Sequence, residues 1–220
     1  MESCLVIIPT YNEIENIHSV IDAVLAQGPQ FSVLIVDDNS PDGTGEVVNI
    51  LKQKESRIHL LQRAGKLGLG TAYIAGFRYG LSHGFDYIFE MDADFSHNPK
   101  DLPRLLEACV QGADMSIGSR YVKGGNIKNW SKDRLFLSYG ASLYVKTITS
   151  LPVQDPTAGF ICYHKRVLEA LDLDKIKFVG YTFQIEMKYY AFIKGFKLAE
   201  VPITFVDREK GNSKMHANIV

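Results

Sequence analysis

Short apolar runs alternate along this chain with segments of helical periodicity, and this alternation restricts the possible fold more than any other feature. The runs at 4–8, 32–37, 57–61, 87–92, 114–118 and 159–163 have the length and composition of buried strands. Between them, apolar residues recur at the spacing of one helical face, as at Ile14, Ile17, Ile21, Val24 and Leu25. Strands that alternate with helices predict an α/β fold with a mostly parallel, Rossmann-like central sheet flanked by helices.

Size and charge narrow the classes of protein to consider. The 220 residues are 46% hydrophobic, enough for one sizeable core, so we expect a single domain over residues 1–220. The 24 Lys and Arg residues are matched by 25 Asp and Glu residues, so no overall field attracts a polyanion. We therefore expect no nucleic-acid partner.

Cysteine usage and hydropathy point to a protein without disulfides or membrane spans. Cys4, Cys109 and Cys162 lie far apart and lack the spacing of a zinc site, which favours buried free thiols. No apolar stretch reaches the ~18 residues needed to cross a bilayer, so we expect a soluble or membrane-surface protein. The weakly patterned segments 123–133 and 207–220 are expected to be mobile loops.

Polar clusters follow three of the predicted strands, where ligands collect in open α/β sheets. They are Pro-Thr-Tyr-Asn-Glu at 9–13, the segment from Asp37 to Thr44, and Asp-Ala-Asp at 92–94. Turn chemistry and helix capping are an equally good interpretation of the first two, because Asn12 with Glu15 resembles a capping box and Ser40 precedes a proline. Asn98, also before a proline, is a further expected helix start.

Asp92 and Asp94 are the sharpest candidates for ligand binding. Two carboxylates close together at the end of an apolar strand repel each other unless a cation lies between them. Mg²⁺ or Mn²⁺ prefers oxygen ligands and takes one or two carboxylates together with substrate phosphates. We therefore expect a divalent cation and a diphosphate here, with a solvated turn as the alternative and His97 beside the metal shell.

A glycine-rich segment offers a competing interpretation. Lys-Leu-Gly-Leu-Gly at 66–70 begins like a dinucleotide-binding motif, but Tyr73 stands where the third glycine belongs. The segment also follows the third strand, whereas a dehydrogenase carries its glycine turn after the first. A dehydrogenase is therefore disfavoured, and Gly68 and Gly70 stay unassigned. Four basic residues occur separately along the later part of the chain: Arg120, Arg134, Arg208 and Lys214. Each alone suggests a surface charge, but as a set they suit phosphate binding.

Taken in order, the motifs resemble glycosyltransferase family 2. The set comprises the clusters at 9–13, 37–44, 66–70 and 92–94 with Gly-Ser-Arg-Tyr at 118–121 and Asp-Pro-Thr-Ala-Gly-Phe at 155–160. Their order and spacing resemble the dolichol-phosphate mannose synthases of that family from residue 5 to residue 214. This resemblance implies a GT-A fold. Asn39 replaces a glycine common in the family, and because asparagine tolerates left-handed backbone we expect the turn to survive.

The resemblance also implies roles for individual residues. Those implied to hold the base and ribose of a guanine nucleotide are Pro9, Tyr11, Glu13, Val36 and Asp38. Those implied to face the diphosphate and the metal are Asp92, Ala93 and Asp94, with Ser96 as a further metal-shell position. Arg120, Arg134 and Ser138 correspond to residues that receive the lipid phosphate. Arg208 and Lys214 would close over the donor phosphates, with Arg120 nearby, and Gln184 and Glu186 match a nearby polar pair. The residues expected to carry catalysis are Asp94, Arg120 and Arg134.

The implied reaction is transfer of mannose from GDP-mannose to dolichyl or polyprenyl phosphate. A phosphate monoester is largely a dianion at neutral pH, so it needs no carboxylate base, and in-line attack predicts inversion. The implied location is peripheral, at the cytosolic face of the endoplasmic reticulum or the prokaryotic plasma membrane, with small membrane partner subunits or direct surface binding. The alternatives are a glucosyl or aminosugar transferase that uses a UDP-sugar and a non-catalytic nucleotide-binding subunit.

Overall fold

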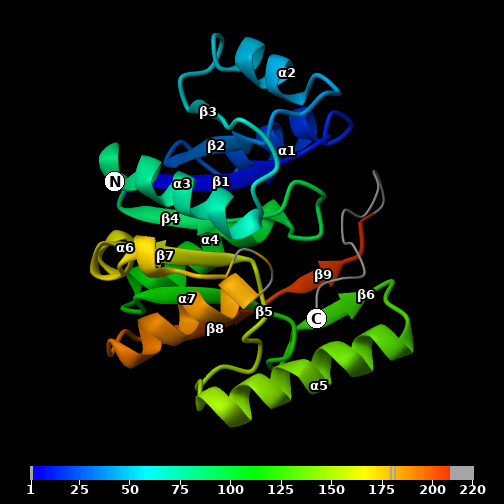
Figure 1. Ribbon diagram of the computed structural model, residues 1–220, viewed down its shortest axis with the longest axis vertical. Coiled ribbons are helices and arrows are strands. Elements are labelled where there is room, and N and C mark those ends of the chain that lie inside the picture. The colour runs from blue at the N-terminus through cyan, green and yellow to red at the C-terminus, as the bar shows by residue number, and fades with distance from the viewer. Residues whose placement is uncertain (1, 179, 181, 209–220) are drawn as a thin grey trace.

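The computed structural model of the chain describes residues 2–178, 180 and 182–208. Its main feature is a seven-stranded sheet in the order β3-β2-β1-β4-β7-β5-β8 (Figure 1). The strands are β1 Cys4–Thr10, β2 Phe31–Asp37, β3 Ile58–Gln62, β4 Tyr87–Glu90, β5 Met115–Ser119, β7 Ile161–His164 and β8 Leu198–Pro202. All six predicted apolar runs form strands of this sheet, which confirms the α/β prediction.

Helices cover both faces of the sheet (Figure 1). One core is formed with α1 Ile17–Leu25, α2 Thr44–Leu51 and α4 Leu102–Val110. The other is formed with α3 Leu69–Ser82, α6 Lys165–Ala170 and α7 Thr182–Ile193. Two 3₁₀ turns, Pro99–Asp101 and Leu173–Lys175, join these elements. The inner strands are buried on both sides, which explains their nearly continuous apolar sequences.

One strand reverses the direction of the sheet. β7 is antiparallel to both of its neighbours, β4 and β5, whereas the remaining pairings are parallel. Ile161 pairs with Glu90 of β4 and with Ile117 of β5. The start of β7 therefore lies at the edge where β4 and β5 end, and it brings the 155–160 segment to the rim that carries the acidic clusters.

A second, two-stranded sheet joins β6 Asn126–Lys128 to β9 Thr204–Val206. The segment 123–133, expected to be a mobile loop, thus contains a strand, because pairing with β9 supplies the order that its own sequence does not signal. The long helix α5, Lys132–Thr149, follows β6 and runs along one end of the molecule (Figure 1). Of the 207–220 loop, only residues 207 and 208 are described.

Helix starts were predicted with mixed success. The Asn98 side chain accepts a hydrogen bond from the backbone of Lys100 at 3.1 Å, so this cap is confirmed. The capping box expected at Asn12 is wrong, because α1 begins only after Asn16. Ser40 does not start α2 either, since Gly43 occupies the N-cap position.

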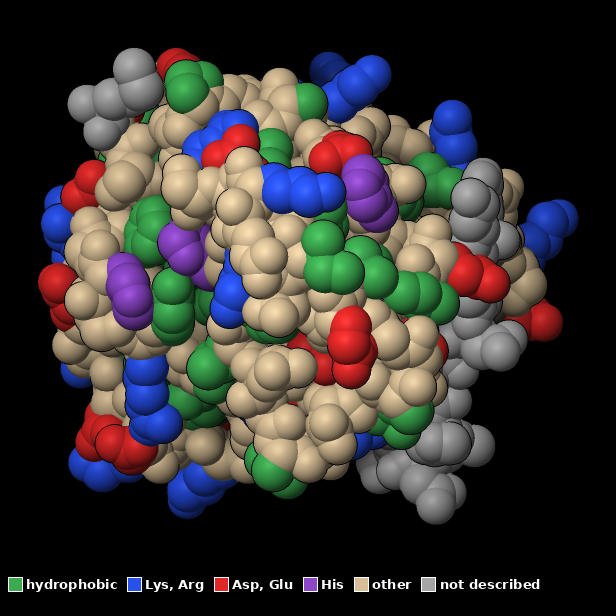
Figure 2. All heavy atoms as spheres, turned by 90° about the horizontal axis from the view of Figure 1, so that it is seen from above, with side chains coloured by type: hydrophobic (Ala, Val, Ile, Leu, Met, Phe, Trp, Pro, Cys, Tyr) green, Lys and Arg blue, Asp and Glu red, His purple; other side chains and the backbone are tan. Residues whose placement is uncertain are grey.

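The distribution of surface charges and the state of the cysteines match what the sequence led us to expect. Figure 2 shows basic and acidic side chains interspersed over the face in view. The three cysteines are buried and free. Within the described residues, none of the helices is both long and apolar enough to cross a bilayer.

Candidate active site

Two loops at the carboxyl ends of β1 and β2 are tied together by hydrogen bonds. The backbone N–H groups of residues 12–14 donate in turn to Ser40 Oγ at 3.0 Å, Thr44 Oγ1 at 3.1 Å and Asp42 Oδ2 at 3.0 Å. Side chains that suggested helix caps in the sequence therefore connect one loop to the next. This places the first two polar clusters side by side at one rim of the sheet.

Neighbouring aspartates at the end of β2 have separate functions. Asp37 is structural: it accepts hydrogen bonds from Thr10 Oγ1 at 2.9 Å and from the Ser40 backbone at 3.0 Å and hydroxyl at 2.5 Å. Asn39 has a φ of 56°, which confirms the left-handed turn expected there. These hydrogen bonds do not involve the Asp38 carboxylate, which can therefore bind a ligand or another side chain.

Arg63 is that partner, and the sequence analysis missed it. Its Nε and Nη2 donate to the two oxygens of Asp38 at 2.6 and 2.8 Å, and its Nη1 donates to Thr71 Oγ1 at 2.8 Å. Lys66 Nζ lies 5.3 Å from the centre of the Tyr11 ring. The glycine-rich segment after β3 thus reaches the predicted nucleotide site. The position of Arg63, directly after a strand, was the available signal.

The other residues expected to hold the base and ribose gather at the same place. Pro9 pairs with Val36 in the register of β1 and β2, and Tyr11 and Glu13 follow directly in the next loop. Glu13 is buried and its Oε1 lies 3.9 Å from Arg208 Nη1. The predicted nucleotide residues therefore form one contiguous group beside the acidic motif.

Asp92 and Asp94 lie in the loop after β4. Asp94 Oδ1 accepts a hydrogen bond from the Ser96 backbone at 3.0 Å, and its Oδ2 pairs with Arg208 Nη2 at 2.7 Å. The Asp92 backbone N–H donates to His97 Nδ1 at 3.2 Å, which leaves the ring proton on Nε2. His97 is buried and its ring stacks on Phe160, so it helps to hold the loop in position.

The electrostatics of this loop suit a divalent cation. Although 41% of the Asp92 side chain is exposed, desolvation raises its pKa above the usual range, Asp94 adds to this and Arg208 opposes it. Among the described residues, no group of three or more His, Cys, Asp or Glu side chains is arranged to hold a metal alone. Two carboxylates therefore fit Mg²⁺ or Mn²⁺ only if a diphosphate supplies further oxygens. Arg208 provides the positive charge beside Asp94 in this structure.

Arg120 is held by a carboxylate that the sequence analysis did not link to it. Its Nε and Nη2 each donate to Asp155 at 2.7 Å, and Nη2 also donates to Thr157 Oγ1 at 2.8 Å. Asp155 is fully buried; burial alone would raise its pKa, but the bonds from Arg120 lower it below the usual range. The antiparallel β7 makes this pair possible, because it returns residue 155 to the end of β5.

A basic and aromatic cluster surrounds Arg120. The guanidinium carbons of Arg134 and Arg120 lie 4.1 and 5.6 Å from the centre of the Trp130 ring. Arg134 Nη1 pairs with Asp207 at 2.8 Å, and Phe205 packs edge-on against Trp130. The two arginines predicted to receive a phosphate are therefore brought together around one indole ring.

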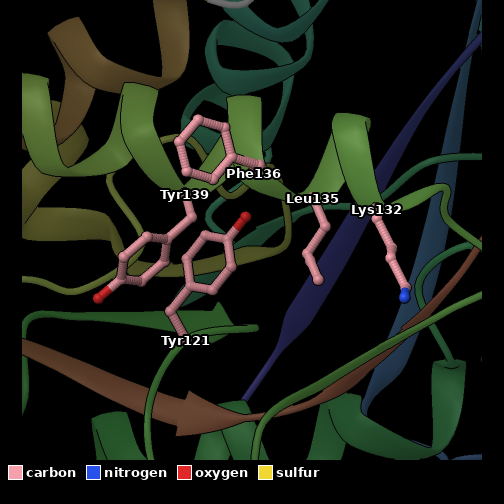
Figure 3. A pocket seen from close by; sticks show the side chains of 5 residues that line it. All are labelled: Tyr121, Lys132, Leu135, Phe136 and Tyr139. Atoms are coloured by element: carbon pink, nitrogen blue, oxygen red, sulfur yellow. The ribbon is translucent and has the colours of Figure 1, made fainter.

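The third predicted phosphate residue lies next to this cluster. Ser138 Oγ accepts a hydrogen bond from the Tyr121 hydroxyl at 2.8 Å. Tyr121 also lines a cavity of about 370 Å³ with Lys132, Leu135, Phe136 and Tyr139 of α5 (Figure 3). Lys214 lies outside the described residues. The basic and aromatic cluster thus adjoins a mostly apolar cavity.

The polar pair expected at Gln184 and Glu186 divides into two roles. Gln184 Nε2 donates to Glu90, which also accepts a hydrogen bond from the Tyr163 hydroxyl at 2.7 Å. Glu186 accepts hydrogen bonds from the backbone of residues 177 and 178. Gln184 therefore supports the strand that leads into Asp92, while Glu186 orders the loop before α7.

Replacing Glu90 with glutamine should flatten the pH dependence of stability below neutrality. Burial raises the pKa of Glu90 from 4.5 to about 7, against the charge of Lys188. Between these values the folded state holds a proton that the unfolded chain has released, so stability falls as the pH rises through this window. Urea unfolding at pH 5 and pH 7 should show a larger loss for the wild type than for Glu90→Gln. Equal losses would assign the slope to another group.

Comparison with known proteins settles the family. Residues 5–172 match the model described as glycosyl transferase family 2. The chain belongs to this family. The family 2 glycosyltransferase is 48% identical to the polyprenol monophosphomannose synthase of Mycolicibacterium smegmatis, over 96% of this chain and 80% of the relative. It is 49% identical to the undecaprenyl-phosphate mannosyltransferase of Micrococcus luteus, over 98% of this chain and 88% of the relative.

Solved structures confirm the GT-A fold of this family 2 glycosyltransferase. Glucosyl-3-phosphoglycerate synthase from Mycobacterium tuberculosis, solved with Mn²⁺, UDP and glucosyl-3-phosphoglycerate, matches with a TM-score of 0.69 at 19% identity, over 96% of this chain and 73% of that one. A mannosyltransferase from Pyrobaculum calidifontis, solved with GDP-Man and Mn²⁺, matches with a TM-score of 0.58 at 16% identity, over 93% of this chain and 56% of that one. At these identities the likeness establishes the fold alone.

Proposed function

We propose that this glycosyltransferase moves mannose from GDP-mannose to a polyprenyl phosphate and produces polyprenyl β-phosphomannose and GDP. The observation that carries the proposal is the placement of two sites at one rim. Asp92 and Asp94 form the acidic site, and Arg120, Arg134 and Trp130 form a basic and aromatic site beside an apolar cavity. Such a pair of sites suits a nucleotide sugar and an amphipathic phosphate. The names of the relatives support the choice of sugar and acceptor.

On the donor side, each group has a role that follows from its chemistry. Pro9, Tyr11 and Asp38, with the remainder of the predicted set, would hold the nucleoside, and Asp92 and Asp94 would hold Mg²⁺ or Mn²⁺. The bound cation would stabilise the charge that develops on the leaving diphosphate. Arg208, already paired with Asp94 at 2.7 Å, is placed to turn toward those phosphates. We assign the same role to Lys214.

On the acceptor side, the protein positions the nucleophile and need not deprotonate it. A phosphate monoester has a second pKa near ~6, so its oxygens are already nucleophilic at neutral pH. Arg120 and Arg134 would orient the dianion from one side while the diphosphate leaves on the other, which requires inversion at the anomeric carbon. Asp155 keeps the Arg120 fork fixed while this happens.

The helix α5 gives the acceptor its route to the protein. Its buried face is small, and large apolar side chains remain exposed along it, including Phe136, Leu137, Leu143, Tyr144 and Ile148. The cavity beneath Phe136 and Tyr139 opens on the same helix (Figure 3). We place this face on the cytosolic surface of the membrane that holds the lipid, with or without a small membrane subunit.

The decisive experiment is transfer of radiolabelled mannose from GDP-mannose to polyprenyl phosphate in vesicles with Mn²⁺ or Mg²⁺, followed by extraction into organic solvent. Parallel reactions with UDP-glucose and a UDP-aminosugar identify the donor. Anomeric analysis of the product should give the β linkage. If label reaches the organic phase only from a UDP-sugar, the mannose assignment is wrong; if it does so from none of the donors, the transferase function itself fails.

Substituting serine for both Phe136 and Leu137 should weaken vesicle binding without lowering stability. These side chains are 82% and 73% exposed, so they contribute little to the folded core. If both insert into lipid, replacing each with serine removes roughly 1.5–3 kcal/mol of membrane-binding free energy. We expect a decrease of at least about tenfold in vesicle partitioning. Ile50→Ser is the matched control, because Ile50 is 54% exposed on α2, at the opposite end of the molecule (Figure 1). Equal binding by all three proteins would contradict the placement of α5.

A further inference from the structure

Within residues 2–178, 180 and 182–208, the indole N–H of Trp130 has no hydrogen-bond partner. Its Nε1 is buried, yet no partner occurs among the described residues. A buried donor without an acceptor destabilises the folded state, because the hydrogen bond it made to water is not replaced. Such a group invites an explanation outside the protein's own hydrogen bonds, such as a ligand that supplies the acceptor.

The surroundings of this N–H identify the acceptor as an anion. The guanidinium carbons of Arg134 and Arg120 both lie over this ring, at 4.1 and 5.6 Å from its centre. Nε and Nη2 of Arg120 donate hydrogen bonds to Asp155 and Thr157. Among the described contacts, Nη1 of Arg120 donates no hydrogen bond. Guanidinium donors beside an indole N–H favour a group that can accept several hydrogen bonds at once, such as a phosphate.

One of the two ion pairs in this cluster can be broken by a ligand. The Arg134–Asp207 pair lies at the surface, with 43% and 35% of the two side chains exposed, whereas the Arg120–Asp155 pair is buried. An exposed ion pair contributes little to stability, so a phosphate dianion can replace the Asp207 carboxylate on Arg134 at little cost. The buried pair then remains as the fixed wall of the site.

The adjoining cavity shows which phosphate fits. Tyr121 touches both regions: its ring faces the Arg120 guanidinium at 5.3 Å, and it lines the cavity on α5 (Figure 3). A ligand that fills both regions has a phosphate at one end and an apolar chain at the other. Free inorganic phosphate would use the first region alone.

We infer that Trp130 is a binding residue for the acceptor, whose indole N–H donates a hydrogen bond to the lipid phosphate between Arg120 and Arg134. This inference rests on the function proposed above, and it adds a residue that the motifs did not single out. It also explains why an aromatic ring with a donor stands here, since phenylalanine would also stack on Arg134 but could not bond the phosphate.

The first test uses the wild-type protein. Because the chain has one tryptophan, a ¹⁵N-labelled sample gives a single indole N–H resonance. Titration with a short-chain isoprenyl phosphate, in the presence of GDP and Mg²⁺, should move this resonance downfield in a saturable manner. Inorganic phosphate should produce the same shift only at much higher concentration. A resonance that stays in place while the isoprenyl phosphate binds would overturn the inference.

The second test removes only the donor. Trp130→Phe should raise KM for polyprenyl phosphate by roughly ten- to a hundredfold, the range for a hydrogen bond to a charged group, with little change in GDP affinity. Stability should not fall through loss of the N–H, because that group bonds to none of the residues that the structure describes. An unchanged KM with normal wild-type turnover would overturn the role of Trp130 alone. Absence of product from the wild type would instead overturn the proposed function.

Discussion

With Asp94 replaced by asparagine, sugar transfer is expected to slow by about a thousandfold or more. The carboxylate would hold the cation against the leaving diphosphate, a stabilisation of several kcal/mol, and each ~1.36 kcal/mol changes the rate tenfold. Asparagine preserves the shape of the side chain and can still accept the Ser96 N–H that bonds Asp94 at 3.0 Å, so the loop should fold normally. Initial rates measured against Mn²⁺ concentration will show the loss.

Two further variants separate the metal role from general effects of charge. Asp172→Asn removes an exposed carboxylate paired with Lys175 near the 3₁₀ turn before α7, and it should leave the rate unchanged. Arg208→Gln removes the partner of Asp94 and should lower turnover without abolishing the response to Mn²⁺. Near-normal rates for Asp94→Asn would refute the metal role of that residue.

Arg120→Ala is expected to lower the free energy of unfolding by about 3–5 kcal/mol, because it leaves the buried carboxylate of Asp155 without its partner. The sequence analysis placed Arg120 at the acceptor phosphate and near the donor phosphates, and it gave no sign of this buried ion pair. Urea unfolding of the wild type and the variant measures the loss directly. The acceptor KM must then be compared under conditions in which both proteins are fully folded.

The double variant Arg120→Ala/Asp155→Ala provides the control for this prediction. Removal of both charges eliminates the unpaired Asp155 carboxylate, so the double variant should recover part of the stability lost by Arg120→Ala. It should not recover use of polyprenyl phosphate. A double variant no more stable than Arg120→Ala would show that packing, and not the unpaired carboxylate, dominates the loss.

The sequence predicted the strands of the sheet well because their apolar runs are long enough to be buried on both faces. It did not reveal that β7 runs against its neighbours, since apolar runs carry no direction. β8 was missed at the edge of the sheet, where its residues are only partly buried and the pattern is weak. β6 depends on pairing with β9, far along the chain, and has no local signal of its own.

The candidate site was predicted in part for a similar reason. Carboxylates at the ends of strands stand out in a sequence, and Asp92, Asp94 and Asp38 do lie at one rim. Their partners are distant in sequence: Arg63 is 25 residues from Asp38, and Asp155 is 35 residues from Arg120. Trp130 was overlooked because an aromatic residue among polar neighbours has many uses, and only the tertiary structure brings two arginines to its ring.

The reversed strand makes the segment between β5 and β7 an excursion from the main sheet, which pairs through β6 with β9 near the end of the described chain. It leaves the sheet at Ser119 and re-enters at Ile161, at the same edge, and the Arg120–Asp155 pair fastens its two ends together. Length and sequence within the excursion can therefore change without disturbing the strand order. Evolution, or a protein engineer, can exchange the module that recognises the acceptor while the half of the molecule that grips the nucleotide stays as it is.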